Sequence, residues 1–113
     1  MPSDERQFLL TAAWLFLRHG QTPRALAICE ALREDDPRDG TTAAALAEIL
    51  LRDGNPARAL DTLRDADVPP RLAHAAAVLE TRALRALGRA REAAARWTRY
   101  LESRKGAARQ WMA

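Results

Sequence analysis

The sequence lacks several features on which common classes of protein depend. It has a single cysteine, Cys29, which excludes an internal disulfide; such a residue ordinarily acts as a small buried apolar side chain. No apolar run approaches the ~20 residues that a membrane-spanning helix needs. The N-terminal residues MPSDERQ lack the basic-then-apolar order of a signal peptide. We therefore expect a cytoplasmic protein that does not insert into a membrane.

Motifs that carry common enzymatic chemistry are also missing. There is no Gly-rich phosphate loop, no set of residues with metal-ligand spacing and no nucleophile elbow. His19 and His74 have no carboxylate or cysteine at ligand spacing. Four acids cluster in one predicted turn, which we expect to be solvated and which lacks the glycine of a calcium loop: Glu34, Asp35, Asp36 and Asp39. The sequence therefore predicts neither an enzyme nor a bound cofactor or metal.

Lysine is nearly absent, and the charge is uneven along the chain. Residues 1–70 hold 8 basic and 12 acidic side chains, whereas residues 71–113 hold 10 and 3. Nucleic acid, an anionic membrane surface and an acidic protein partner are all compatible with such a basic end. We expect no nucleic-acid binding, because no aromatic side chain is interleaved with the arginines of the predicted inner face, where it could stack on bases.

Short helix-breaking segments recur at a constant interval. The segments HGQTPRAL, DGNPARAL and LGRAREAA begin at residues 19, 53 and 87, and each carries glycine at its second position. Glycine suits the left-handed conformation that ends a helix, and an alanine follows each glycine at the same distance, at residues 25, 59 and 93. A period of 34 residues is the length of a tetratricopeptide repeat, which is a helical hairpin.

The repeat pattern predicts an all-α fold. We place the repeats at residues 6–39, 40–73 and 74–107 of one domain, 1–113, with a short tail at 108–113. Helices are expected over residues 4–18, 22–35, 41–53, 56–67, 70–87 and 90–104. Three stacked hairpins should form a right-handed superhelix with a concave groove. Repeat three is the least regular, because Glu80 and Thr81 stand where an apolar and a small residue are expected.

The first helix of each hairpin should form the inner wall of this groove. Leu10, Trp14 and Leu17 give the first helix a second apolar face at spacing i, i+4, i+7. An exposed apolar patch beside arginines is typical of an interface, although Trp14 could instead fill the core. The predicted partner-binding residues are Gln7, Leu10, Trp14, Leu17, Arg18, Glu48, Leu51, Arg52, Val78, Arg82 and Arg85.

Aromatic residues also gather near the C-terminus. Trp97 and Tyr100 lie on the last predicted helix, and Trp111 lies in the tail. A solenoid normally hides its terminal apolar face under a capping helix. We expect either that Trp111 folds back onto this face or that another chain covers it, such as a second copy in a homodimer that forms when no other partner is bound.

Two segments, ERQFLLTAAWLFLRHGQTPRAL and RWTRYLE, resemble the small tetratricopeptide chaperones of bacterial type III secretion, specifically the SctY (YscY) family. The matching residues are Gln7-Phe8-Leu9-Leu10, Trp14-Leu15, Leu17, Gly20, Arg24-Ala25 and Tyr100-Leu101-Glu102. The resemblance implies a cytoplasmic chaperone in a virulence-associated export system. It would hold the small secreted protein SctX in its groove and engage the cytoplasmic domain of the export gate, SctV.

Other readings of the same architecture stay open at this point. Chaperones for needle subunits and for translocators in the same secretion systems share the repeat fold, and a self-associating scaffold would also carry it. In our register Leu10, Trp14, Leu17 and Leu51 would anchor a client. The arginines expected to meet its acids or carbonyls are Arg18, Arg52, Arg82 and Arg85.

Overall fold

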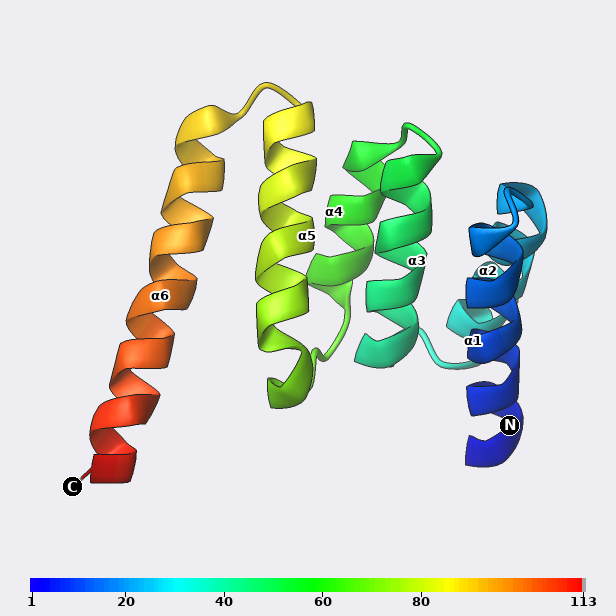
Figure 1. The fold of residues 1–113 in the computed structure, drawn as a ribbon, viewed down its shortest axis with the longest axis horizontal. Helices are drawn as coiled ribbons and strands as arrows, with labels where there is room; N and C mark the ends of the chain where they lie inside the picture. The colour runs from blue at the N-terminus through cyan, green and yellow to red at the C-terminus, as the bar shows by residue number, and fades with distance from the viewer. Residues whose placement is uncertain (113) are drawn as a thin grey trace.

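The helices of the computed structural model pack as consecutive hairpins. The structure describes residues 1–112. Its elements are α1 (Ser3–Arg18), α2 (Thr22–Asp35), α3 (Gly40–Arg52), α4 (Pro56–Asp65), a 3₁₀ turn η1 (Pro70–Leu72), α5 (Ala73–Ala86) and α6 (Ala90–Met112). Helix α2 packs on α3 and α4 on α5, while α3 also contacts both α1 and α5. The hairpins therefore follow one another along the longest axis, with the two ends of the chain at opposite ends of it (Figure 1). The prediction of an all-α fold of helical hairpins is confirmed.

The three recurring glycines end the first helix of each hairpin in the same way. Gly20, Gly54 and Gly88 have φ of 73°, 78° and 77°, a region that side chains with a Cβ avoid. In each turn the glycine amide and the next amide donate to carbonyls of the last helical turn, for example Gly54 N to Leu51 O at 3.1 Å and Asn55 N to Leu50 O at 2.8 Å. These bonds satisfy carbonyls that the helix end would leave unpaired, so the chain reverses within a few residues.

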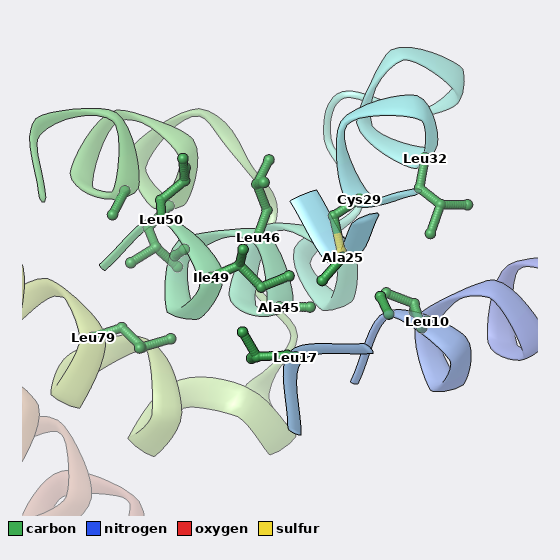
Figure 2. Packing of buried hydrophobic residues seen from close by; sticks show 14 of the residues in the cluster. Leu10, Leu17, Ala25, Cys29, Leu32, Ala45, Leu46, Ile49, Leu50 and Leu79 are labelled. Atoms are coloured by element: carbon green, nitrogen blue, oxygen red, sulfur yellow. The ribbon is translucent and has the colours of Figure 1, made fainter. Parts of the chain in front are cut away.

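Small residues allow the two helices of each hairpin to approach closely. Ala25, Ala59 and Ala93 are 0%, 0% and 2% exposed. Figure 2 shows Ala25 and Cys29 of α2 near Ala45 and Leu46 of α3, and all four belong to the main core cluster. Burial raises the pKa of the Cys29 thiol to about 11, with a smaller contribution from the neighbouring Glu30 charge. The thiol is thus a packing group at neutral pH.

A clamp around Arg6 joins the first two hairpins. Its guanidinium donates to Asp35 at 2.8 Å, to Asp39 at 2.7 Å and to the Thr42 hydroxyl at 2.9 Å. Asp39 also caps α3 by accepting from the Thr41 amide at 3.1 Å. Two of the four clustered acids therefore hold an arginine, which corrects the expectation that the whole cluster is solvated.

Asp39 is held in its ionised form by this clamp. Burial alone would raise the pKa of Asp39, but hydrogen bonds from Thr42, Arg6 and the Thr41 amide, together with the Arg6 charge, favour the carboxylate. Its pKa therefore lies below the usual value.

The neighbouring Gly40 is required for a different reason: a Cβ there would lie 2.3 Å from the Asp67 carbonyl oxygen, because the two inter-hairpin loops run side by side.

Of the two irregular residues of repeat three, Glu80 forms an ion pair instead of an apolar contact. Glu80 is 9% exposed, and its carboxylate accepts from Arg96 Nε at 2.8 Å. The Thr81 hydroxyl is buried without a hydrogen-bond partner in the described chain. The pair ties α5 to α6, where the equivalent position of repeat two, Leu46, makes an apolar contact in the core.

Two helix ends differ from expectation by more than two residues. The Pro69-Pro70 step leads into the 3₁₀ turn η1, so α5 starts at Ala73 and not at residue 70. Helix α6 was expected to end at residue 104, but it continues to Met112 and includes most of the predicted tail; residue 113 lies outside the described residues. Residues 101–112 are all exposed and extend about 18 Å at 1.5 Å per residue. In Figure 1 this end of α6 leans away from α5.

Candidate functional site

The first helices of the hairpins line an elongated hollow of about 470 Å³. Helix α1 contributes Gln7, Leu10 and Trp14, whereas α3, η1 and α5 supply the remaining lining, namely Thr41, Ala44, Ala45, Glu48, Arg52, Leu72, His74, Ala75, Val78, Leu79 and Arg82. Trp14 is 40% exposed and is therefore not a core residue. A large apolar side chain open to solvent inside a hollow is typical of a recognition surface.

The lining follows the 34-residue repeat position by position. One row consists of Gln7, Thr41 and Ala75, a second of Leu10, Ala44 and Val78, and a third of Trp14, Glu48 and Arg82. Each row takes one residue from α1, one from α3 and one from α5. The hollow is therefore a consequence of stacking equivalent helices, and its chemistry differs along its length because the repeats differ in sequence.

Four of the predicted partner-binding residues do not line this hollow. Leu17 is 5% exposed and belongs to the core cluster, and Leu51 is half-buried against the core. Arg18 is exposed at the end of α1, outside the lining. Arg85 lines a different hollow between α5 and α6. The position three residues after the Trp14 row, occupied by Leu17 in repeat one and Leu51 in repeat two, packs against the core. The face that lines the hollow is therefore narrower than predicted.

An ion-pair triad from α3 and α5 lies in and beside the Trp14 row of the hollow. Glu48 accepts from Arg52 Nε at 3.0 Å and from Arg82 at 2.7 Å. The Glu48 side chain is 15% exposed, while the two arginines are about half exposed. Arg52 and Arg82 are therefore already oriented by one carboxylate, and the triad carries a net charge of +1. The hollow combines apolar walls with an excess of one positive charge.

The aromatic residues of α6 have separate roles. The rings of Trp97 and Tyr100 lie 5.4 Å apart and pack on His74 at 6.0 Å and 5.6 Å, so they fasten α6 to the start of α5. Trp111 is 92% exposed at the far end of α6. Of the two alternatives for the terminal face, the one in which Trp111 folds back is thus wrong, because α6 continues as a helix through residues 105–112.

Some lining residues were missed by sequence reasoning. Leu72 ends the 3₁₀ turn η1 and His74 lies in the first turn of α5, next to the Pro-Pro step that breaks the repeat register. Ala45 and Leu79 are core residues with one edge on the hollow. Because Ala45 and Leu79 are 34 residues apart, the repeat predicts that they share a face, but it does not predict that this face borders the hollow.

Within residues 1–112 no group of three or more His, Cys, Asp or Glu side chains is arranged to hold a metal ion. None of the helices in this part of the chain combines the length and apolar character that crossing a bilayer demands. Stacked helical hairpins with a shared hollow define the class of protein: a helical-repeat scaffold for protein–protein interaction.

Comparison with known families agrees with this class. The family described as tetratricopeptide repeat matches residues 16–80, more than half of the chain. The chain belongs to the tetratricopeptide repeat family. No curated protein and no solved structure matches it.

Proposed function

We propose that this chain is a chaperone that holds an apolar segment of a small protein partner in the hollow lined by α1, α3 and α5. The observation that carries the proposal is the exposed Trp14 in a hollow whose walls repeat the same positions in every hairpin. Helical repeats commonly bind extended or helical peptides on such a surface, with aromatic and arginine side chains as the main contributors.

The chemistry of the hollow limits what it would bind. Leu10, Ala44 and Val78 form an apolar row, and Trp14 lies in the neighbouring row beside Glu48 and Arg82 of the triad. A client segment with apolar side chains and one acidic residue beside them would fit both features. The acid would be attracted by the excess charge of Arg52 and Arg82, which lose little freedom on binding because Glu48 already orients them.

The identity of the client is proposed from the resemblance of the first helix to the SctY chaperones. On that basis the client is a small, secreted, SctX-like protein of a bacterial type III secretion system, and the complex delivers it to the export gate, SctV, from the cytoplasm. A partly disordered secretion substrate exposes apolar segments, and binding in a hollow covers them while leaving the client unfolded enough for export. Needle-subunit and translocator clients are the alternatives within the same systems.

Co-expression with small proteins encoded near the gene, followed by copurification, tests the proposal. We expect one of them to form a stable complex, and Trp14→Ala to weaken it roughly 30-fold, as loss of a binding hot spot of about 2 kcal/mol would. Trp111→Ala is the matched control, since it removes an exposed tryptophan far from the hollow. A complex that tolerates Trp14→Ala as well as Trp111→Ala would place the client elsewhere on the chain.

Salt dependence separates a protein client from a phosphate-bearing one. Binding that depends on apolar contacts should survive an increase in salt, whereas phosphate binding falls steeply with it. The type III assignment depends further on which partner is recovered. If the recovered client is a needle subunit or a translocator, the protein is a chaperone of that client class and uses the same binding site.

A further inference from the structure

The outer face of α1 exposes two large apolar side chains at positions whose equivalents in repeat two are buried. Phe8 is 72% exposed and Leu15 is 52% exposed. Shifted by 34 residues, Leu15 becomes Ile49, which is 1% exposed, and Phe8 becomes Thr42, which is 0% exposed. Both of the later residues are covered because a preceding hairpin packs on α3. The outer face of α1 is therefore shaped like a surface that receives a preceding hairpin, and within residues 1–112 nothing covers it.

The opposite end of the solenoid has the converse feature. A hollow of about 380 Å³ lies between α5 and α6 and is lined by Thr81, Arg85, Ala90, Ala93, Ala94 and Trp97. Ala94 is exposed there, whereas its equivalent in repeat two, Leu60, is 2% exposed. In repeat two this surface is where the following first helix, α5, packs on α4. The hollow is thus an open seat for a further first helix.

Charge matches the two ends to each other. The first turn of α1 carries Asp4 and Glu5. Helix α3 starts only five residues after α2 ends, so a first helix begins beside the C-terminal end of the second helix before it. The same placement on α6 would set the acidic first turn of α1 near Arg104 and Lys105. Placed in this way, the outer face of α1 would meet the hollow with its apolar side chains and the basic end of α6 with its acidic first turn.

We propose that a second copy of this chain docks head to tail, with its α1 seated on α5 and α6 in the position of a fourth first helix. Leu15 of one copy would approach the hollow beside Trp97 of the other, and the acidic first turn would face the basic end of α6. Such a contact is heterologous: each copy keeps one free face, so association continues beyond a dimer unless the arrangement closes into a ring.

A symmetric pairing through α6 is disfavoured by the same charges. Two copies of the exposed segment 101–112 would bring Arg104, Lys105 and Arg109 against one another, with Glu102 as the single acid on each side. Like charges at close range oppose binding. The head-to-tail contact also leaves the client hollow free, because Leu10 and Trp14 lie on a different face of α1 from Phe8 and Leu15.

Complementation between two variants tests the proposal. Phe8→Asp blocks only the outer face of α1, and Ala94→Arg blocks only the hollow between α5 and α6; both positions are exposed, so the fold should be kept. We expect the unaltered chain to grow in mass with concentration in sedimentation velocity. Each variant alone should stay monomeric, with association weakened roughly 30-fold or more. An equimolar mixture of the two variants should form a 1:1 dimer and nothing larger.

The controls separate this contact from every other. Trp111→Ala should leave association unchanged, and higher salt should weaken it because the charged groups are exposed. Arg104→Glu tests the basic end without altering the hollow and should weaken association. A chain that stays monomeric, a Phe8→Asp variant that still associates, or a mixture that stays monomeric while circular dichroism shows both variants folded would overturn the proposal. Dissociation by Trp111→Ala would overturn it too, because the contact would then lie at the exposed C-terminal end of α6 around Trp111.

Discussion

Breaking the ion pair between Glu80 and Arg96 should strongly destabilise the last hairpin. The two side chains are 12% and 16% exposed and lie 2.8 Å apart. The change Arg96→Met keeps much of the aliphatic stem but removes the charge, so the Glu80 carboxylate stays buried without its partner. Removing one partner of a buried ion pair costs about 3–5 kcal/mol. We expect about 3 kcal/mol, near the lower end, because a hollow beside the pair gives the carboxylate some access to water.

The repeat itself suggests the compensating change. Leu46 stands at the position equivalent to Glu80 and is 0% exposed. In the double variant Glu80→Leu with Arg96→Met, an apolar contact replaces the ion pair. Such replacements are often neutral or stabilising by about 1–4 kcal/mol. The double variant should therefore be at least as stable as the unaltered chain, which gives a strong favourable coupling between the two substitutions.

Urea unfolding followed by far-UV circular dichroism measures these free energies for the four chains of the cycle. Arg99→Met is the matched control, because Arg99 is exposed on the same helix and its loss should change stability by less than about 0.5 kcal/mol. The reasoning fails if Arg96→Met costs no more than Arg99→Met. It also fails if the double variant is as unstable as Arg96→Met alone, since the buried carboxylate would then not be the cause.

Three further outcomes follow from single residues. Gly40→Ala should cost about 1–3 kcal/mol in urea unfolding, because its Cβ would lie 2.3 Å from a backbone oxygen, while Gly106→Ala, with nothing within 4 Å, should gain about 0.5–1 kcal/mol. The pKa of Asp39 is lowered on folding, so its stabilising effect is complete above its unfolded pKa and is lost as pH falls through its folded pKa; melting temperatures of Asp39→Asn should therefore fall less between pH 5 and pH 2 than those of the unaltered chain. Cys29, with a pKa of about 11, should react with iodoacetamide at pH 8 only as fast as the chain opens, and a fast reaction in the folded state would contradict its burial.

Much of the fold could be predicted because the sequence repeats a physical constraint. Glycine is needed where the backbone takes a positive φ, and alanine where two helices touch, so Gly54 and Ala59 recur with their equivalents 34 residues away. The same shift placed Leu10, Trp14, Val78 and their neighbours on one wall. Periodicity therefore predicts which residues share a face, since one helix geometry is repeated.

Periodicity could not predict how deep each face lies. Leu17 has the spacing of the inner face, yet it packs into the core near the turn, where α1 meets α3. Glu80 stands where repeat two has the buried Leu46, and Arg96 stands where it has the buried Thr62, so two charges replace two uncharged core residues. Opposite charges at two core positions of one hairpin are the signal that indicates a buried ion pair; either residue alone looks like an irregularity.

The end of α6 was missed because local sequence is a weak guide to where a helix stops. Gly106 in a helix costs only about 1 kcal/mol relative to alanine, and the neighbouring Ala107, Ala108 and Arg109 favour helix. Basic residues near a helix C-terminus also interact favourably with its dipole. Continuation of α6 is thus consistent with propensity, whereas the predicted end relied on the length of a standard repeat.

The two proposed surfaces meet on one helix and can still be separated. Helix α1 directs Leu10 and Trp14 toward the hollow, and Phe8 and Leu15 toward the outside. Residues on opposite sides of a helix that share no partner should act independently, so their effects on binding should add. If Phe8→Asp left client binding intact while Trp14→Ala left self-association intact, the helix would carry two functions. If each variant disturbed both, client and second copy would compete for α1, and self-association would then regulate access to the hollow.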